Sequence, residues 1–205
     1  MNTTSQSLLS HALDSSDAVA DILTLYATRG DDHYGEHVSQ REHAEQCAWH
    51  AQADGADEAL VVAALLHDIG HLLHKFGEDA ADRGIDTRHE RIGSGYLARI
   101  LPPAVTRPIA LHVAAKRYLA TANPEYLEGL SDASLQSFIL QGGMMSEAEM
   151  AAFQADPDHD AAMKLRAYDE LGKVVGVEMP GFATYEPMIR RLMVGADVAV
   201  GAGAA

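Results

Sequence analysis

The adjacent pair His67-Asp68 stands in an otherwise apolar run that extends from Ala63 to Gly70. Burying an ionised carboxylate costs on the order of several kcal/mol unless a cation or hydrogen bonds compensate it. A bound metal ion would explain both side chains at once, because imidazole and carboxylate groups are common metal ligands. This interpretation requires further ligands elsewhere in the chain.

Candidate ligands of this kind occur in, or at the start of, five predicted helices. They are His43, His67, Asp68, His89, His112 and Asp169. Imidazole and carboxylate ligands together suit iron, manganese or zinc. Six protein ligands exceed what one catalytic metal needs while it keeps an open position. Two metal ions bridged by Asp68 would use the six ligands economically.

Two cations accompany these ligands at helical spacing. Lys116 follows His112 by four residues, and Arg166 precedes Asp169 by three. Residues at these spacings share one helix face, so each ligand is paired with a positive charge. The chain has a formal net charge of −15, which argues against nucleic acid or an anionic membrane as a partner. An anionic substrate must therefore be held by a local group of cations such as this one.

The elements that position these residues are all predicted to be helices. Apolar spacing and helix-ending signals favour an all-α bundle, with no alternating strand pattern of any length. The predicted helices span about 19–30, 39–53, 58–74, 89–100, 105–121, 131–140, 146–154, 159–171 and 185–193. The 205 residues, 47% of them hydrophobic, predict a single domain over 1–195 with its core at about 30–185. The glycine-rich end, 196–205, is expected to be a flexible tail.

Several features favour a cytoplasmic protein. The single cysteine, Cys47, fits a reducing compartment. The start of the chain lacks the basic and apolar regions of a secretory signal. No stretch reaches the roughly 18 consecutive apolar residues of a membrane span.

The pattern of ligands resembles the H...HD...D signature of HD-domain proteins. His89 and His112, between the HD pair and the final Asp169, resemble the subset that holds two metals. The chain is most similar to the HD-domain mixed-valent diiron oxygenases of the PhnZ type, over about residues 30–185. The segments that carry this resemblance are Gly35-Glu36, Ala63–Asp68, His112–Leu119, Leu130–Ser134, Gln141–Gly143 and Arg166–Glu170.

The resemblance implies a reaction that splits the carbon-phosphorus bond of a 1-hydroxyalkylphosphonate with dioxygen. Two iron ions, as an Fe(II)/Fe(III) pair, would be the cofactor. One iron would bind His43, His67, Asp68 and Asp169, and the other would bind Asp68, His89 and His112. Lys116, Ser134, Gln141 and Arg166 would bind the substrate. The substrate supplies the electrons, which fits the absence of a glycine-rich dinucleotide motif.

The loop before the first ligand is expected to contact the other end of the substrate. The resemblance assigns catalytic and substrate-binding roles to Tyr34 and Glu36, although His33 stands where the family's iron-covering tyrosine is expected. The acidic residues Glu36, Asp31 and Asp32 and the ring of Tyr34 favour a substrate with a cationic nitrogen. The first choice is (R)-1-hydroxy-2-(trimethylammonio)ethylphosphonate, giving glycine betaine and phosphate. The alternative is (R)-2-amino-1-hydroxyethylphosphonate, giving glycine. A separate hydroxylase would supply either substrate.

Other functions use the same kind of site. The main rival is an HD-type metal-dependent phosphohydrolase, in which a metal-bound hydroxide attacks a phosphate ester. Cleavage of a cyclic polyol by a diiron oxygenase and ligand sensing without turnover are further alternatives. His89, His112 and the two cations favour carbon-phosphorus cleavage over these three.

Overall fold

The computed structural model describes residues 17–194, and these residues are helical with no strand among them. The prediction of an all-α bundle is confirmed. The expected tail at 196–205 and the start of the chain lie outside the described residues. No helix in the described part is long and apolar enough to cross a membrane.

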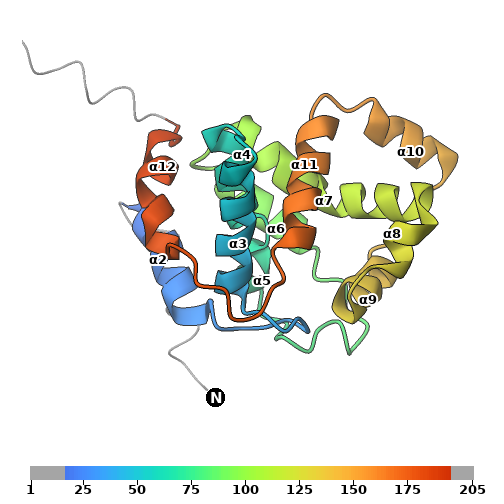
Figure 1. Cartoon of the computed structure of the whole chain (residues 1–205), viewed down its shortest axis with the longest axis horizontal. Helices are drawn as coiled ribbons and strands as arrows, with labels where there is room; N and C mark the ends of the chain where they lie inside the picture. Colours follow the sequence, from blue (N-terminus) through green and yellow to red (C-terminus); the bar gives the residue numbers. More distant parts are fainter. Residues whose placement is uncertain (1–16, 195–205) are drawn as a thin grey trace, which may run out of the picture.

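Four helices form the centre of the molecule, and the others pack around them (Figure 1). They are α3 (Gln40–Ala53), α4 (Glu58–Leu66), α7 (Pro103–Ala122) and α11 (His159–Leu171). Every residue of α4 from Leu60 to Leu66 is buried. A helix that is apolar on all faces must be surrounded, and α4 contacts α3, α7 and α11. The core of the bundle therefore lies around α4.

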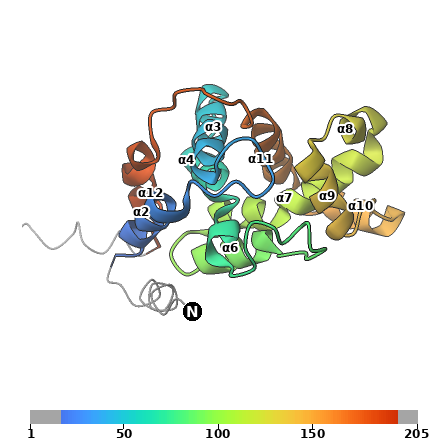
Figure 2. The ribbon, with the colours of Figure 1, turned by 90° about the horizontal axis from the view of Figure 1, so that it is seen from below.

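The remaining helices cover this centre. On one side, α2 (Ala18–Arg29), the 3-10 helix η1 (Phe182–Tyr185) and α12 (Glu186–Arg191) pack together. The Tyr26 ring stacks on Phe182 with 4.0 Å between centroids, and the Tyr26 hydroxyl donates a hydrogen bond to the Leu65 carbonyl. On the other side lie α8 (Pro124–Glu128), α9 (Asp132–Leu140) and α10 (Glu147–Gln154), next to the far end of α7 (Figure 2).

The predicted helix at 58–74 is two helices, so this boundary prediction was wrong. The first, α4, ends at Leu66, and α5 runs over Ile69–Leu73. Asp68 lies between them with φ −99° and ψ 7°, in the sparsely populated bridge region where many active-site residues are found. The apolar run continues through both helices and hides the break.

Smaller differences concern helix ends. The helix α6 spans His89–Leu97 instead of reaching residue 100, and α7 begins at Pro103 rather than Val105. Proline fits the first helical position, because its fixed φ suits a helix and its missing N–H has no partner there. The five-residue helix α8 was not predicted at all.

Candidate metal centre and substrate pocket

One group of candidate ligands comes from α3, the α4–α5 junction and α11. The Nε2 atoms of His43 and His67 are 3.3 Å apart. Oδ1 of Asp169 lies 3.4 Å from His43 Nε2. Oδ2 of Asp68 lies 3.5 Å from His67 Nε2 and 3.7 Å from His43 Nε2. Two nitrogens and two carboxylate oxygens therefore surround one point.

A second group lies on the other side of Asp68. His89 at the start of α6 and His112 on α7 approach each other with their Nε2 atoms 3.0 Å apart. Oδ1 of Asp68 is 3.3 Å from His89 Nε2 and 3.6 Å from His112 Nε2. The two oxygens of Asp68 therefore face different groups of histidines, as a carboxylate that bridges two metal ions must.

Backbone carbonyls hold three of the histidine rings in place. The Nδ1 atoms of His43, His67 and His112 donate to carbonyl oxygens at 2.8, 2.9 and 2.7 Å, respectively. The acceptors are the carbonyls of Gly172, Ala64 and Ile109. A hydrogen bond from Nδ1 fixes the tautomer and leaves the Nε2 lone pair for a metal. All three Nε2 atoms are directed into the cluster.

Two glycines permit the close packing of the segments that carry the ligands. A Cβ on Gly70 would lie 2.0 Å from the carbonyl oxygen of His89. A Cβ on Gly172 would lie 2.5 Å from Cys47 Sγ and 3.2 Å from His43 Nδ1. No side chain other than hydrogen fits at these approaches. The backbone beside each group of ligands therefore depends on glycine.

Burial keeps two of the histidines in the form that binds metal. Burial lowers the pKa of His67 below its usual value. Burial and the neighbouring His89 lower the pKa of His112 to about 3. Burial works to raise the pKa of Asp169, but Arg166 and His43 outweigh it, so this pKa lies well below its usual range. Burial acts to lower the pKa of His43 as well, but Cys47 and Asp169 outweigh it and raise this pKa well above its usual value. His43 must therefore release a proton when a metal ion binds, whereas His67, His112 and Asp169 already carry the charge of a metal ligand.

This arrangement fits two metal ions. The donors are nitrogen and oxygen atoms only, which suits iron, manganese or zinc. Two other side chains lie close enough to be considered as metal ligands. Cys47 lies beside His43 and His67, and His71 lies beside Asp68 and His89. Cys47 Sγ lies 3.7 Å from Nδ1 and 3.8 Å from Nε2 of His43. The His71 ring stacks flat on His89 with 4.0 Å between centroids, which favours a packing role.

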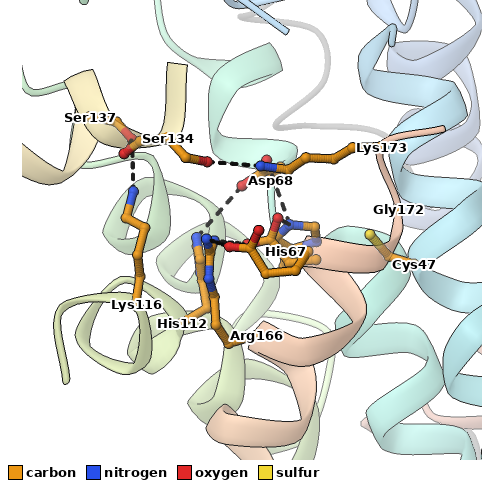
Figure 3. A network of polar contacts seen from close by, with 12 residues as sticks. Cys47, His67, Asp68, His112, Lys116, Ser134, Ser137, Arg166, Gly172 and Lys173 are labelled. Carbon is orange, nitrogen blue, oxygen red and sulfur yellow. Dashed lines mark hydrogen bonds and ion pairs between the residues drawn. The ribbon is translucent and has the colours of Figure 1, made fainter. Parts of the chain in front are cut away.

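A pocket opens next to the cluster, and three cations line it. They are Lys116 from α7, Arg166 from α11 and Lys173 just after α11. Figure 3 shows Lys116 and Lys173 extending toward α9 from opposite sides of the cluster. Tyr34, Glu36, Ser134 and Gln141 also line the pocket. All six predicted substrate-binding residues therefore lie on the pocket wall beside the predicted ligands.

Lys116 is buried and has one hydrogen-bond partner. Its Nζ donates to Ser137 Oγ at 2.7 Å, and only 4% of the residue is exposed. Burial, together with the nearby charge of Arg166, lowers the pKa of Lys116 to about 7. An anion in the pocket would restore the counter-charge that this ammonium lacks.

Arg166 is held on three sides. Its Nε donates to the Tyr126 hydroxyl at 2.7 Å. Its two other nitrogens form ion pairs with Asp169 and Glu170. The guanidinium therefore positions the predicted ligand Asp169 in addition to lining the pocket.

The predicted loop residues have partners outside the ligand cluster. The Tyr34 hydroxyl donates to the His71 carbonyl at 2.6 Å and accepts from Arg29 at 2.8 Å. His33 is exposed, and its backbone N–H donates to Glu78. Neither side chain has a recorded contact with the six predicted ligands, so the question of which one covers a metal stays open.

Ser137 and Lys173 are pocket residues that contact predicted site residues but were not themselves predicted. Ser137 accepts from Lys116, and it follows Ser134 by three residues on the same face of α9. Lys173 donates to Glu36 Oε1 at 2.9 Å and to Ser134 Oγ at 2.8 Å. Lys173 follows Asp169 by four residues, which could have indicated it, but it lies beyond the end of α11 at Leu171.

Comparisons with known proteins agree with this site. The sequence profile of the HD domain matches residues 35–156. The chain is 40% identical over 170 residues to a (1-hydroxy-2-(trimethylamino)ethyl)phosphonate dioxygenase (glycine-betaine-forming) of Leisingera caerulea, covering 82% of this chain and 87% of that protein. It is 43% identical over 168 residues to a hydroxymethylphosphonate dioxygenase of Gimesia maris, covering 82% and 84%.

A third relative, an uncharacterized protein of Acanthamoeba polyphaga mimivirus, is 38% identical over 161 residues and covers 77% of this chain and 73% of its own length. The two bacterial relatives are named as dioxygenases that act on hydroxyalkylphosphonates, and both match most of the chain. These similarities confirm the resemblance found in the sequence. The chain belongs to the HD-domain family, in the group that includes the hydroxyalkylphosphonate dioxygenases.

Proposed function

We propose that the protein cleaves the carbon-phosphorus bond of a 1-hydroxyalkylphosphonate with dioxygen, and that it does so with two iron ions. The observation that carries the two-metal part of the proposal is Asp68, whose two oxygens face separate groups of buried histidines. The group of His43, His67 and Asp169 would hold one iron, and His89 with His112 the other. The second group has fewer protein ligands and leaves positions for substrate.

The cofactor would be a mixed-valent Fe(II)/Fe(III) pair, which supplies one-electron chemistry with dioxygen. The reaction converts a carbon that bears hydrogen, hydroxyl and phosphonate into a carboxylate, and it releases phosphate. One dioxygen balances the oxygen atoms of the two products. The chain's own task is to bind the phosphonate, present C1 to the metal pair and keep bulk water away.

The phosphonate would be bound by the cations beside the cluster. The buried ammonium of Lys116 and the guanidinium of Arg166 bracket the space next to Asp169. Hydrogen bonds between charged groups and phosphonate oxygens are short and strong. Gln141 has a buried side-chain oxygen with no hydrogen-bond partner among the described residues. This oxygen can accept from the substrate's hydroxyl group, and the amide NH2 of the same side chain can donate to a phosphonate oxygen. Ser134 contributes a hydroxyl.

The substrate that the sequence and one of the two named relatives favour is (R)-1-hydroxy-2-(trimethylammonio)ethylphosphonate, with glycine betaine and phosphate as products. The support is the 40% identity to a dioxygenase named for this reaction. The primary amine analogue, (R)-2-amino-1-hydroxyethylphosphonate, is the alternative. The protein would act in organophosphonate catabolism in the cytoplasm, after a separate hydroxylase that installs the 1-hydroxyl group.

A phosphohydrolase would need a similar metal pair and similar cations, so the geometry alone favours neither reaction. The relatives named as dioxygenases favour the oxidative one. The decisive test supplies iron-loaded protein with hydroxyphosphonates and with phosphate monoesters, in air and under argon. The proposal predicts phosphate release from a hydroxyphosphonate in air only. Release from the esters under argon would identify a hydrolase.

A further inference from the structure

The acidic residues expected to attract a cationic nitrogen are each paired with a basic residue. The pairs are Asp31 with Arg41, Asp32 with Arg29, and Glu36 with Lys173. Of the three acidic residues, only Glu36 lines the pocket. The charge of the Glu36 carboxylate is therefore already balanced by a lysine of the chain.

The Lys173 ammonium binds Glu36 and Ser134, two of the predicted substrate-binding residues. Its Nζ donates to Glu36 Oε1 at 2.9 Å and to Ser134 Oγ at 2.8 Å. Ser131 donates to the same oxygen of Glu36 at 2.8 Å. The side chains of Lys173 and Glu36 are 17% and 21% exposed, so solvent screens their ion pair only partly. A cationic nitrogen would have to share or displace this ammonium.

The backbone on both sides of Lys173 is fixed to α3. The carbonyl of Gly172 accepts from His43 Nδ1 at 2.8 Å. Val174 donates its N–H to Gln46 Oε1 at 3.0 Å, and its carbonyl accepts from Gln46 Nε2 at 2.9 Å. Gln46 is 2% exposed, so this clamp is buried. Lys173 is therefore held at the pocket, and only its side chain is free to turn.

We propose that Lys173 is a specificity-determining residue: it competes with a cationic substrate nitrogen for Glu36 and shifts selectivity toward hydroxyphosphonates with an uncharged C1 substituent. This inference rests on the proposed function. A trimethylammonium group has no N–H to donate, so its attraction to Glu36 is electrostatic and is cancelled while the lysine is in place. A substrate without a cationic nitrogen, such as hydroxymethylphosphonate, leaves the ion pair intact.

The test compares binding of hydroxymethylphosphonate and of (R)-1-hydroxy-2-(trimethylammonio)ethylphosphonate by calorimetry. Iron-loaded protein is used under argon, so binding is measured without turnover. Lys173→Gln removes the charge but keeps a hydrogen-bonding side chain. We expect the Kd ratio to shift toward the cationic ligand by about tenfold, or about 1.4 kcal/mol. Glu36→Gln should shift it the other way.

Two further variants serve as controls. Lys173→Arg keeps the charge and should leave the Kd ratio near that of the wild type. Lys164→Gln removes an exposed lysine on α11 that does not line the pocket, and it should change neither Kd. If Lys173→Gln and Lys164→Gln gave the same ratio of Kd values for the two ligands, the inference would be overturned. Equal weakening of both ligands would also overturn it, since Lys173 would then be a contact to the phosphonate.

Oxygen uptake by the same samples in air separates this inference from the proposed function. A shifted Kd ratio without oxygen uptake on any hydroxyphosphonate would uphold the role of Lys173 in binding and contradict the oxygenase. Oxygen uptake with an unshifted Kd ratio would support the oxygenase and contradict the role of Lys173. Failure of wild-type protein to bind either ligand would contradict both.

Discussion

Gly70→Ala is expected to damage one metal position and spare the other. A Cβ at Gly70 would lie 2.0 Å from the carbonyl oxygen of His89 and 2.6 Å from its carbonyl carbon. Both contacts are to backbone, so no side-chain rotation relieves them. Cβ contacts under 3.0 Å essentially never occur, so α5 and the start of α6 must separate by about 1 Å.

This displacement is large on the scale of metal coordination. Protein ligands keep their distances to a metal within about 0.2 Å, so His89 moved by about 1 Å no longer binds in its place. His43 and Asp169 lie on α3 and α11, and His67 directly follows α4, so these three ligands should keep their geometry. We therefore expect metal content to fall from two ions per chain toward one, with loss of oxygen uptake. The overpacking should also cost about 1–3 kcal/mol of unfolding free energy.

Metal analysis after gel filtration, together with thermal unfolding, measures both effects. Gly95→Ala is a matched control on α6, because a Cβ there meets no atom within 4 Å. It should keep two ions per chain and the wild-type Tm or a slightly higher one, since alanine favours a helix over glycine. If Gly70→Ala held two ions as tightly as Gly95→Ala, the assignment of His89 to a second metal would be refuted.

Three further predictions concern the other side chains of the site. Asp68→Ala should lose both ions in metal analysis, whereas an unchanged content would show that Asp68 is no ligand. Arg166→Ala should raise KM and also lower metal content, because its ion pair with Asp169 is lost; full metal content would restrict Arg166 to substrate binding. The kcat/KM should decline as pH rises through about 7, where Lys116 loses the proton that binds the anion. Lys116→Arg should move this decline to higher pH, since a guanidinium stays protonated.

The fold was largely predictable because apolar spacing and capping signals are local. Ser39 with Glu42 forms the capping box expected at the start of α3, and α4 is buried on all sides as its apolar sequence indicates. The break at Asp68 was not predictable, because the apolar pattern continues from α4 into α5. Its cause is the tertiary packing of α5 on α6, where Gly70 lies against the His89 backbone.

The candidate site was predictable in its residue types but not in its pairings. A histidine or aspartate in an apolar helix stands out in the sequence, and so do cations at helical spacing from it. The ion pair between Glu36 and Lys173 joins residues 137 positions apart. No periodic pattern encodes such a contact. The sequence therefore predicted that Glu36 contacts a substrate nitrogen, whereas in the fold its carboxylate is paired with Lys173.

The stoichiometry of oxygen uptake tests the central claim most directly. Iron-loaded protein is supplied with a hydroxyphosphonate in an oxygen electrode, while phosphate and the carboxylate product are quantified in the same sample. The account predicts one dioxygen consumed for each phosphate and each carboxylate formed. Phosphate released without matching oxygen consumption would contradict it and would place this metal centre among the hydrolases.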